Sequence, residues 1–169
     1  MKLHKHFLVS LTFITSLINA IPDANAAVGS ANFNVTATLT SACTIGGIVD
    51  LAFGTVTAFV APASPTTTAA VSCTRGLTGV TAVFDTTNGT SSAAGTTPTG
   101  AGVLDNGLQY TLSTAKGAVL GGTAATAASI GTADTFTYTI TGAMAAQAGA
   151  CATGSCVATP QVRTLTLNF

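Results

Sequence analysis

Alternation of apolar and polar residues is the clearest signal along this chain, and it runs unbroken from residue 33 to residue 40. The apolar positions are Phe33, Val35, Ala37 and Leu39, and asparagine or threonine fills each position between them. Successive side chains of an extended backbone point to opposite faces, so the pattern predicts a strand with one buried face. From Phe33 to Leu39 such a strand is roughly 23 Å long, at about 3.3 Å per residue.

Shorter segments repeat this alternation further along the chain. They cover residues 69–73, 80–84, 108–112, 136–140 and 165–169, and a further apolar segment at 51–56 contains Gly54, which suggests a bulge or a strand end. Asn88-Gly89 and Asn106-Gly107 are tight-turn signals between them. About seven short strands separated by turns predict an all-β sandwich.

Two regions lack this alternation. Residues 91–102 are low in complexity and rich in Ser, Thr, Ala and Gly, so we expect a long exposed loop there. Residues 116–131 are rich in Ala and Gly, and their glycines make a helix unfavourable.

The first 26 residues have the composition of a signal peptide. A basic head with Lys2 and Lys5 precedes a mostly apolar run over residues 7–18, and Ala24-Asn25-Ala26 supplies the small-x-small cleavage pattern. The apolar run is shorter than the roughly 20 residues that span a bilayer, which disfavours a retained anchor. We therefore expect cleavage after Ala26 and export of residues 27–169, with no membrane span in the mature chain.

Loss of the leader leaves little charge. Both histidines lie in residues 1–26, and three cationic and four acidic residues remain, for a formal net charge of −1. A chain with so few cations lacks the basic surface that nucleic acids require. Weak self-repulsion instead suits a protein that associates with other copies or with related subunits.

Four cysteines are present, Cys43, Cys73, Cys151 and Cys156. Export to an oxidising compartment favours disulfides over zinc, and the spacing lacks two close C-x-x-C pairs. Three connectivities are possible, and pairing Cys43 with Cys73 and Cys151 with Cys156 keeps each pair close in sequence.

A catalytic site is hard to assemble from residues 27–169. No histidine is present to act as a general base, and no phosphate-binding loop occurs. Asp85, Asp105 and Asp134 adjoin turn signals, which favours a role in turns over catalysis. Tyr110 and Tyr138 alternate with apolar residues, which favours core positions over ligand stacking. We expect neither enzymatic activity nor a cofactor or metal.

Several motifs, taken in order, resemble the spore coat protein U domain family, which includes pilus subunits of the archaic chaperone–usher pathway. They are 41–46 (SACTIG), 51–54 (LAFG), 71–74 (VSCT), 108–112 (LQYTL) and 165–169 (LTLNF). The resemblance implies an immunoglobulin-like sandwich that lacks one strand, over residues 43–169. It also implies that residues 27–42 are a donor-strand extension that fills the gap in a neighbouring subunit.

The resemblance assigns roles to individual residues. Phe33, Val35, Ala37 and Leu39 match the donor positions, and Cys43 and Cys73 match the family disulfide. Leu165, Leu167 and Phe169 match the C-terminal strand to which a periplasmic chaperone adds its own strand. An outer-membrane usher would then exchange the chaperone for the next subunit, so that the protein passes through the periplasm and ends in a surface pilus or fimbrium.

Two other functions are compatible with the composition. One is an adhesive or carbohydrate-binding module, although tryptophan is absent. The other is a spore-coat or matrix protein that self-associates without an usher.

Overall fold

A computed structural model describes residues 29–152, 154 and 156–169 of the chain. The expected signal peptide, residues 1–26, lies outside the described residues. The remainder divides at Thr38 into an N-terminal unit and a domain that begins at Leu39, and each is described by itself.

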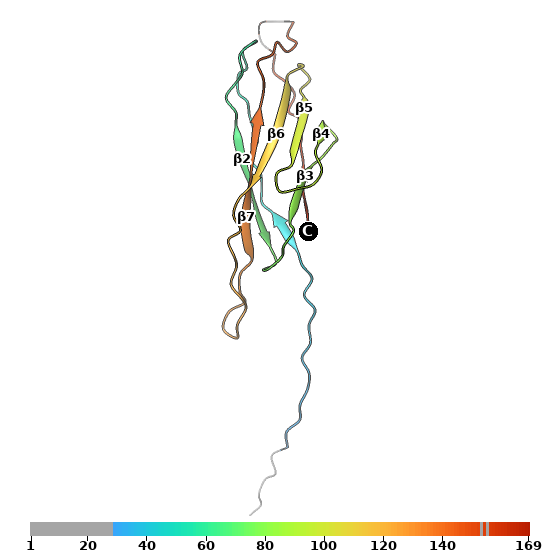
Figure 1. The fold of residues 1–169 in the computed structure, drawn as a ribbon, viewed down its shortest axis with the longest axis vertical. Coiled ribbons are helices and arrows are strands. Elements are labelled where there is room, and N and C mark those ends of the chain that lie inside the picture. Colours follow the sequence, from blue (N-terminus) through green and yellow to red (C-terminus); the bar gives the residue numbers. More distant parts are fainter. Residues whose placement is uncertain (1–28, 153, 155) are drawn as a thin grey trace, which may run out of the picture. The chain divides into compact units, whose positions relative to one another are not determined.

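The described residues of the domain form eight strands, most of which are labelled in Figure 1. They are β1 (Cys43–Ile45), β2 (Thr66–Cys73), β3 (Thr81–Phe84), β4 (Thr90–Ser91), β5 (Thr99–Val103), β6 (Gln109–Lys116), β7 (Asp134–Ala143) and β8 (Leu165–Asn168). Six form an antiparallel sheet in the order β1-β2-β7-β6-β5-β4, and β3 pairs with β8 in a second, two-stranded sheet. No helix occurs in the part of the chain that the structure describes.

The two sheets join along one side. Ala82 of β3 exchanges backbone hydrogen bonds with Gly95, which follows β4, at 2.8 and 2.9 Å. The strands therefore form one curled antiparallel arrangement, a half-barrel that begins at β1 and ends at β8. The all-β prediction is confirmed, and this arrangement is consistent with the predicted immunoglobulin-like sandwich.

The interior of the half-barrel follows the alternation that the sequence shows. In β7, Phe136, Tyr138 and Ile140 are buried, whereas the threonines between them lie on the outer face or are half-buried. β2 and β6 repeat the pattern on either side, with Val71 and Leu112 among their buried residues. Threonine suits the outer positions because its branched side chain fits a pleated surface.

Two expectations about individual segments are wrong. Residues 91–102 are not one exposed loop, because β5 begins at Thr99 and Pro98, Gly100 and Gly102 are buried. The low-complexity sequence hides this strand because small residues are needed there: a Cβ on Gly102 would lie 2.4 Å from the Tyr110 ring. Residues 51–56 form no strand. Gly54 has a φ of 68°, and Leu51 and Phe53 pack against the core from an irregular segment.

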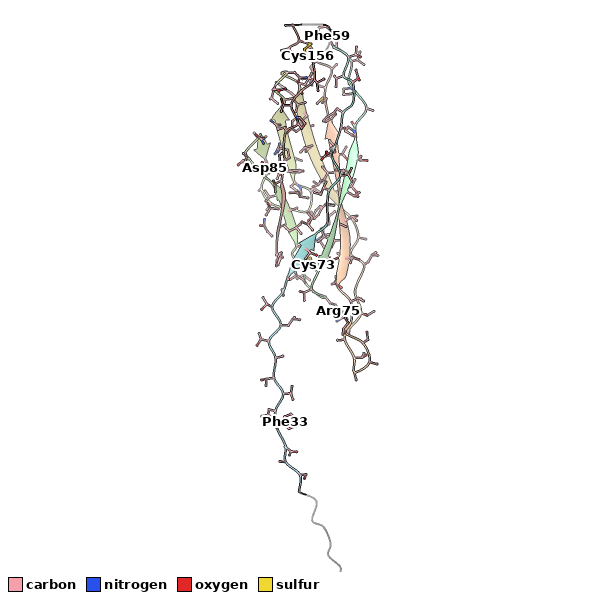
Figure 2. All side chains as sticks on the ribbon, turned by 180° about the vertical axis from the view of Figure 1, so that it is seen from behind. Phe33, Phe59, Cys73, Arg75, Asp85 and Cys156 are labelled. Atoms are coloured by element: carbon pink, nitrogen blue, oxygen red, sulfur yellow. A yellow bond between two sulfur atoms is a disulfide. The ribbon has the colours of Figure 1, made fainter. Side chains whose placement is uncertain are left out.

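The domain has two ends, which we call proximal and distal. The proximal end holds Cys73 and Asp134, which are paired in register, and the distal end holds the opposite ends of β2 and β7. Figure 2 labels Cys73 and Arg75 toward the proximal end, and Phe59 and Cys156 at the distal end. β1 runs from the proximal end toward the distal end, and β8 runs in the opposite direction.

Candidate functional site

The half-barrel leaves two strand edges without a partner. Each of β1 and β8 pairs on one side only, with β2 and with β3 respectively, among the strands that the structure describes. We call the unpaired edges of β1 and β8, with the apolar side chains that face inward beside them, the open edge. Unpaired edge strands present backbone donors and acceptors to any further strand.

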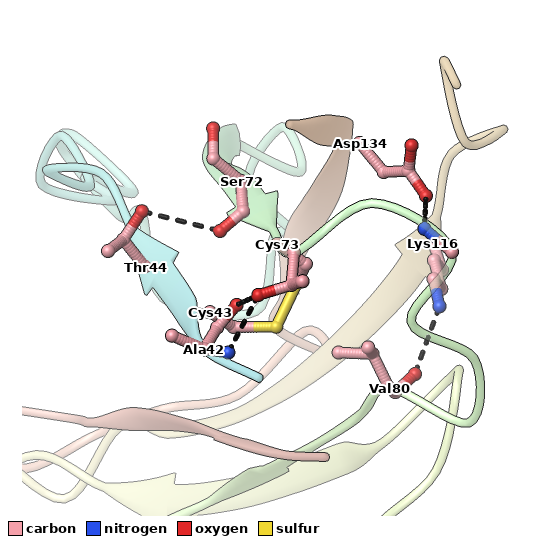
Figure 3. The surroundings of a disulfide bond; sticks show 10 residues. Ala42, Cys43, Thr44, Ser72, Cys73, Val80, Lys116 and Asp134 are labelled. Atoms are coloured by element: carbon pink, nitrogen blue, oxygen red, sulfur yellow. Dashed lines mark hydrogen bonds between the residues drawn. A yellow bond between two sulfur atoms is a disulfide. The ribbon is translucent and has the colours of Figure 1, made fainter. Parts of the chain in front are cut away.

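On the β1 side, the open edge is fixed to the domain by a disulfide (Figure 3). Cys43 is bonded to Cys73, so the pairing that the family resemblance implies is present in the structure. The preceding residue is also held, because Ala42 N donates to Thr74 Oγ1 at 2.9 Å and Thr74 N donates to Ala42 O at 2.8 Å. Ile45 lies on the same face as Cys43 but is 38% exposed.

On the β8 side, the inward-facing residues become more exposed toward the end of the chain. Leu165 is 7% exposed, Leu167 is half-buried and Phe169 is 58% exposed. Leu165 and Leu167 belong to β8 and Phe169 follows its last residue, and the role in chaperone binding that the resemblance implies for the three residues stays a prediction. This row of apolar side chains is therefore only partly covered by the described residues of the domain.

The segment with the strongest alternation is not part of any strand in this structure. Residues 29–42 form neither strand nor helix and are exposed throughout. Phe33 is 84% exposed, Val35 84% and Leu39 82%, and Ala37 is exposed as well. Their assignment as donor residues for another subunit therefore stays a prediction.

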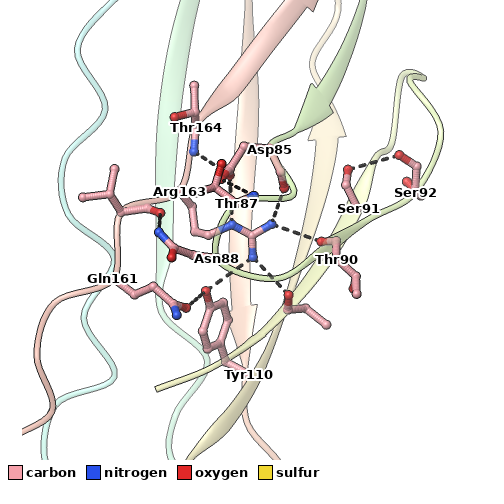
Figure 4. A network of polar contacts seen from close by, with 12 residues as sticks. Asp85, Thr87, Asn88, Thr90, Ser91, Ser92, Tyr110, Gln161, Arg163 and Thr164 are labelled. Atoms are coloured by element: carbon pink, nitrogen blue, oxygen red, sulfur yellow. Dashed lines mark hydrogen bonds and ion pairs between the residues drawn. The ribbon is translucent and has the colours of Figure 1, made fainter. Parts of the chain in front are cut away.

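A buried arginine stands next to the start of β8 (Figure 4). The side chain of Arg163 is 8% exposed, and its Nε lies 3.0 Å from Oδ1 of Asp85, whose side chain is 17% exposed. The two terminal nitrogens donate to the carbonyl oxygens of Asp85, Thr90 and Ala101 and to the Tyr110 hydroxyl, at 2.9–3.3 Å. These contacts use all five N–H groups of the guanidinium and tie the last strand to β3, β4, β5 and β6.

No sequence motif predicted this network. One signal was available, because Arg163 precedes Leu165 by two residues and so shares the inward face of β8. Its partners are separated from it by 53 to 78 positions, and only the curl of the half-barrel brings them together. Tyr110 in turn donates to Gln161 Oε1, and both tyrosines expected in the core are buried.

Hydrogen bonds stabilise the ionised form of three aspartates. Burial alone would raise the pKa of Asp85, but Thr164 N–H and the Arg163 guanidinium hold it below its ordinary value of 3.8. The Thr159 hydroxyl and backbone N–H lower the pKa of Asp105, and backbone N–H groups of Gly122 and Gly76 lower that of Asp134. Each carboxylate thus joins segments that are distant in sequence.

These lowered pKa values predict acid sensitivity. A carboxyl whose pKa is lower in the folded state stabilises the fold above its unfolded pKa, and this stabilisation is lost as pH falls through the folded pKa. We expect the free energy of unfolding to be nearly constant from about pH 7 to pH 5 and to fall below about pH 4. Denaturant titrations across this range measure it. In Asp85→Asn, the free energy of unfolding should fall less steeply below about pH 4. The same steep fall in this variant would contradict the role given to Asp85.

A second disulfide lies at the distal end. Cys151 is bonded to Cys156, so all four cysteines are paired as the closest sequence pairing suggested. This bridge closes a short loop, whereas the Cys43–Cys73 bridge spans 30 positions.

The two bridges should differ in their effect on stability. In the chain-entropy model a loop of 30 residues is stabilised by about 3.6 kcal/mol and one of 5 residues by about 2 kcal/mol. The Cys43→Ala/Cys73→Ala variant should therefore lower the free energy of unfolding more than Cys151→Ala/Cys156→Ala does. Denaturant unfolding of the purified protein tests the order. A larger loss from the distal pair would refute it.

Comparison with known proteins gives one match. A sequence model of the Spore Coat Protein U domain matches residues 30–155, about three quarters of the chain. No curated protein and no solved structure matches significantly. Within the described residues, no helix is long and apolar enough to cross a bilayer.

Proposed function

Because the chain belongs to the Spore Coat Protein U domain family, whose members are pilus-type subunits, we propose that it is a structural subunit of a surface pilus. In this proposal residues 27–42 of one copy add a strand to the open edge of the next copy. Phe33, Val35, Ala37 and Leu39 face the interior of the half-barrel. The supporting observation is that one chain carries both an uncovered open edge and an exposed segment with the alternation of a half-buried strand.

The donor segment and the open edge are each unfavourable when they stand alone in water. Exposed Phe33, Val35 and Leu39 and the partly covered residues of β8 leave apolar surface in water. Burial of the three large donor side chains would contribute roughly 5–8 kcal/mol by area, as an upper bound. Backbone hydrogen bonds to the free edges of β1 and β8 would add to this gain.

The direction of the added strand decides what assembles. A strand antiparallel to β8 runs from the proximal to the distal end, so Leu39 lies nearest the distal end of the acceptor. The proximal end of the donating domain then faces the distal end of the acceptor, and this head-to-tail contact does not close on itself. A strand parallel to β8 would bring two proximal ends together and favour closed pairs. We propose the antiparallel arrangement because it yields a fibre.

Assembly of this kind needs protection of the open edge before the donor arrives. We propose that residues 1–26 direct export, and that a periplasmic chaperone covers β8 at Leu165, Leu167 and Phe169. An outer-membrane usher then exchanges the chaperone for the next subunit. Residues 43–169 form the pilin domain, and no catalytic role is proposed.

A self-complemented chain tests the proposal. A copy of residues 31–40 is appended after Phe169 through a linker of about four residues, which suffices for an antiparallel return along β8 but not for a parallel one. We expect this chain to be a soluble monomer that does not polymerise. The matched control carries the appended copy with Val35→Asp and Leu39→Asp, and it should behave like the parent chain.

Fibres provide the second measurement. Surface fibres purified from cells that express the parent chain should contain it as a component, as mass spectrometry can show. If the parent chain with residues 27–40 deleted is a stable monomer in the absence of a chaperone, the domain is complete and the proposal fails.

A further inference from the structure

A hairpin between β6 and β7 extends beyond the proximal end of the sheet (Figure 1). It comprises residues 117–133, and we call it the proximal hairpin. Its apolar side chains are uncovered: Ile130 is 99% exposed, Leu120 69% and Val119 51%. Nothing within its own domain accounts for three large apolar residues in this position.

The proximal hairpin is held in a definite shape. Leu120 and Thr135 exchange backbone hydrogen bonds at 2.7 and 2.9 Å, and Thr132 N donates to Thr123 O at 2.9 Å. Thr126 and Ser129 close the tip with a further pair of hydrogen bonds. At the base, Asp134 Oδ1 accepts from Gly122 N at 2.6 Å, and Arg75 Nε donates to Gly122 O at 3.0 Å.

The linker to a donor strand leaves from the same end and is short. Ala42 is fixed to Thr74, and Leu39 is the last apolar residue of the donor pattern. Only Thr40 and Ser41 lie between them, so the Cα atoms of Leu39 and Ala42 are at most about 11 Å apart. An acceptor that holds Leu39 must therefore lie within this distance of the proximal end.

The hairpin is longer than the linker. Thr126 at its tip lies six positions after Leu120, which corresponds to roughly 20 Å of fully extended chain. Its base adjoins β7, which is separated from β1 only by β2. Because the extended hairpin can span about 20 Å and the linker at most about 11 Å, the hairpin is long enough to contact a domain held at the end of that linker.

We propose that the proximal hairpin is a second contact between successive copies of this chain, with Ile130 and Leu120 packed against the acceptor beside its open edge. The inference rests on the proposed donor-strand assembly and adds an interface to it. Exposed apolar residues flank the open edge on both sides, Val49 after β1 at 77% and Val162 before β8 at 74%. The donor strand would hold the subunits together, and the hairpin would fix the angle between them.

Photocrosslinking in intact fibres tests the contact. Benzoylphenylalanine is placed at position 130 of the full chain, and in a matched control at position 113, where Ser113 is exposed on the outer face of β6. Irradiated fibres should give covalent subunit dimers from position 130 and only background from position 113. Peptide mapping should place the cross-link on the acceptor near Val49 or Val162. If the probe at 130 blocks export, the same probe at Leu120 decides the question.

The outcomes separate the two proposals. Fibres whose subunits cross-link no better from the hairpin than from position 113 overturn this inference and leave donor-strand assembly intact. A failure of the parent chain to form fibres overturns both. In the supporting case, Leu120→Ser/Ile130→Ser fibres should show a wider spread of angles between subunits in electron micrographs than Ala127→Ser fibres.

Discussion

Leu39→Asp is expected to abolish fibre formation while export, oxidation and chaperone capture of the subunit continue. Leu39 is 82% exposed in its own subunit, so a charge there disturbs little of the subunit's own fold. In the open edge of a neighbour, the same carboxylate would be buried without a partner. That costs several kcal/mol or forces uptake of a proton, which is comparable with the whole side-chain gain estimated for the donor strand.

A charge on the other face of the same strand is the matched control. Thr38→Asp introduces the same group one residue away, but the alternation turns this side chain to the outside of the acceptor. Fibres should form from Thr38→Asp and not from Leu39→Asp, as judged by co-purification with the chaperone followed by imaging. Loss of chaperone-bound Leu39→Asp subunit would refute the donor assignment, as would normal fibres.

How much of this structure the sequence predicts depends on the range of the interactions. The strands β2, β6, β7 and β8 follow from period-two alternation, because each buries one face against the same interior. β5 does not follow from the pattern, because Gly100 and Gly102 lie against bulky neighbours, so that this strand needs small residues and its composition resembles that of a loop. The alternation within one segment does not show that a side chain on another strand, such as Tyr110, requires a small residue there.

The open edge illustrates the same limit. That a strand begins at Leu165 and includes Leu167 follows from the alternation of residues 165–169. That this strand has one partner only depends on the order of the sheet, which closes through Gly95 and Ala82 on the opposite side. Residues 33–40 are the converse case, because their alternation is the clearest in the chain and yet they form no strand in the structure. If these residues donate a strand to another copy, their sequence should have the alternation of a strand although they form none in their own subunit.

Arg163→Met is expected to destabilise the subunit itself and therefore to reduce chaperone-bound protein as well as fibres. The substitution removes the cation paired with Asp85 and the guanidinium hydrogen bonds to three carbonyl oxygens, and the carboxylate keeps only backbone N–H donors, among them Thr164 N. Removal of one partner from a buried ion pair typically costs about 3–5 kcal/mol, and the 17% exposure of Asp85 places the expected loss toward the lower figure. This is a large part of the 5–15 kcal/mol that typically stabilises a domain.

Three variants test whether Arg163 stabilises the subunit through its charge, through the geometry of its guanidinium group, or merely as one more arginine. Arg163→Lys keeps the charge but not the planar fork, so it should recover only part of the stability. Arg75→Met removes an exposed arginine whose side chain donates to Gly122 O, and it should have little effect. In denaturant unfolding, Arg163→Met combined with Asp85→Asn should lose less than the sum of the two single losses, because the second change removes the charge that the first leaves unpaired. Additive losses would show that Arg163 and Asp85 act independently, and that the network does not hold β8 in place as a unit.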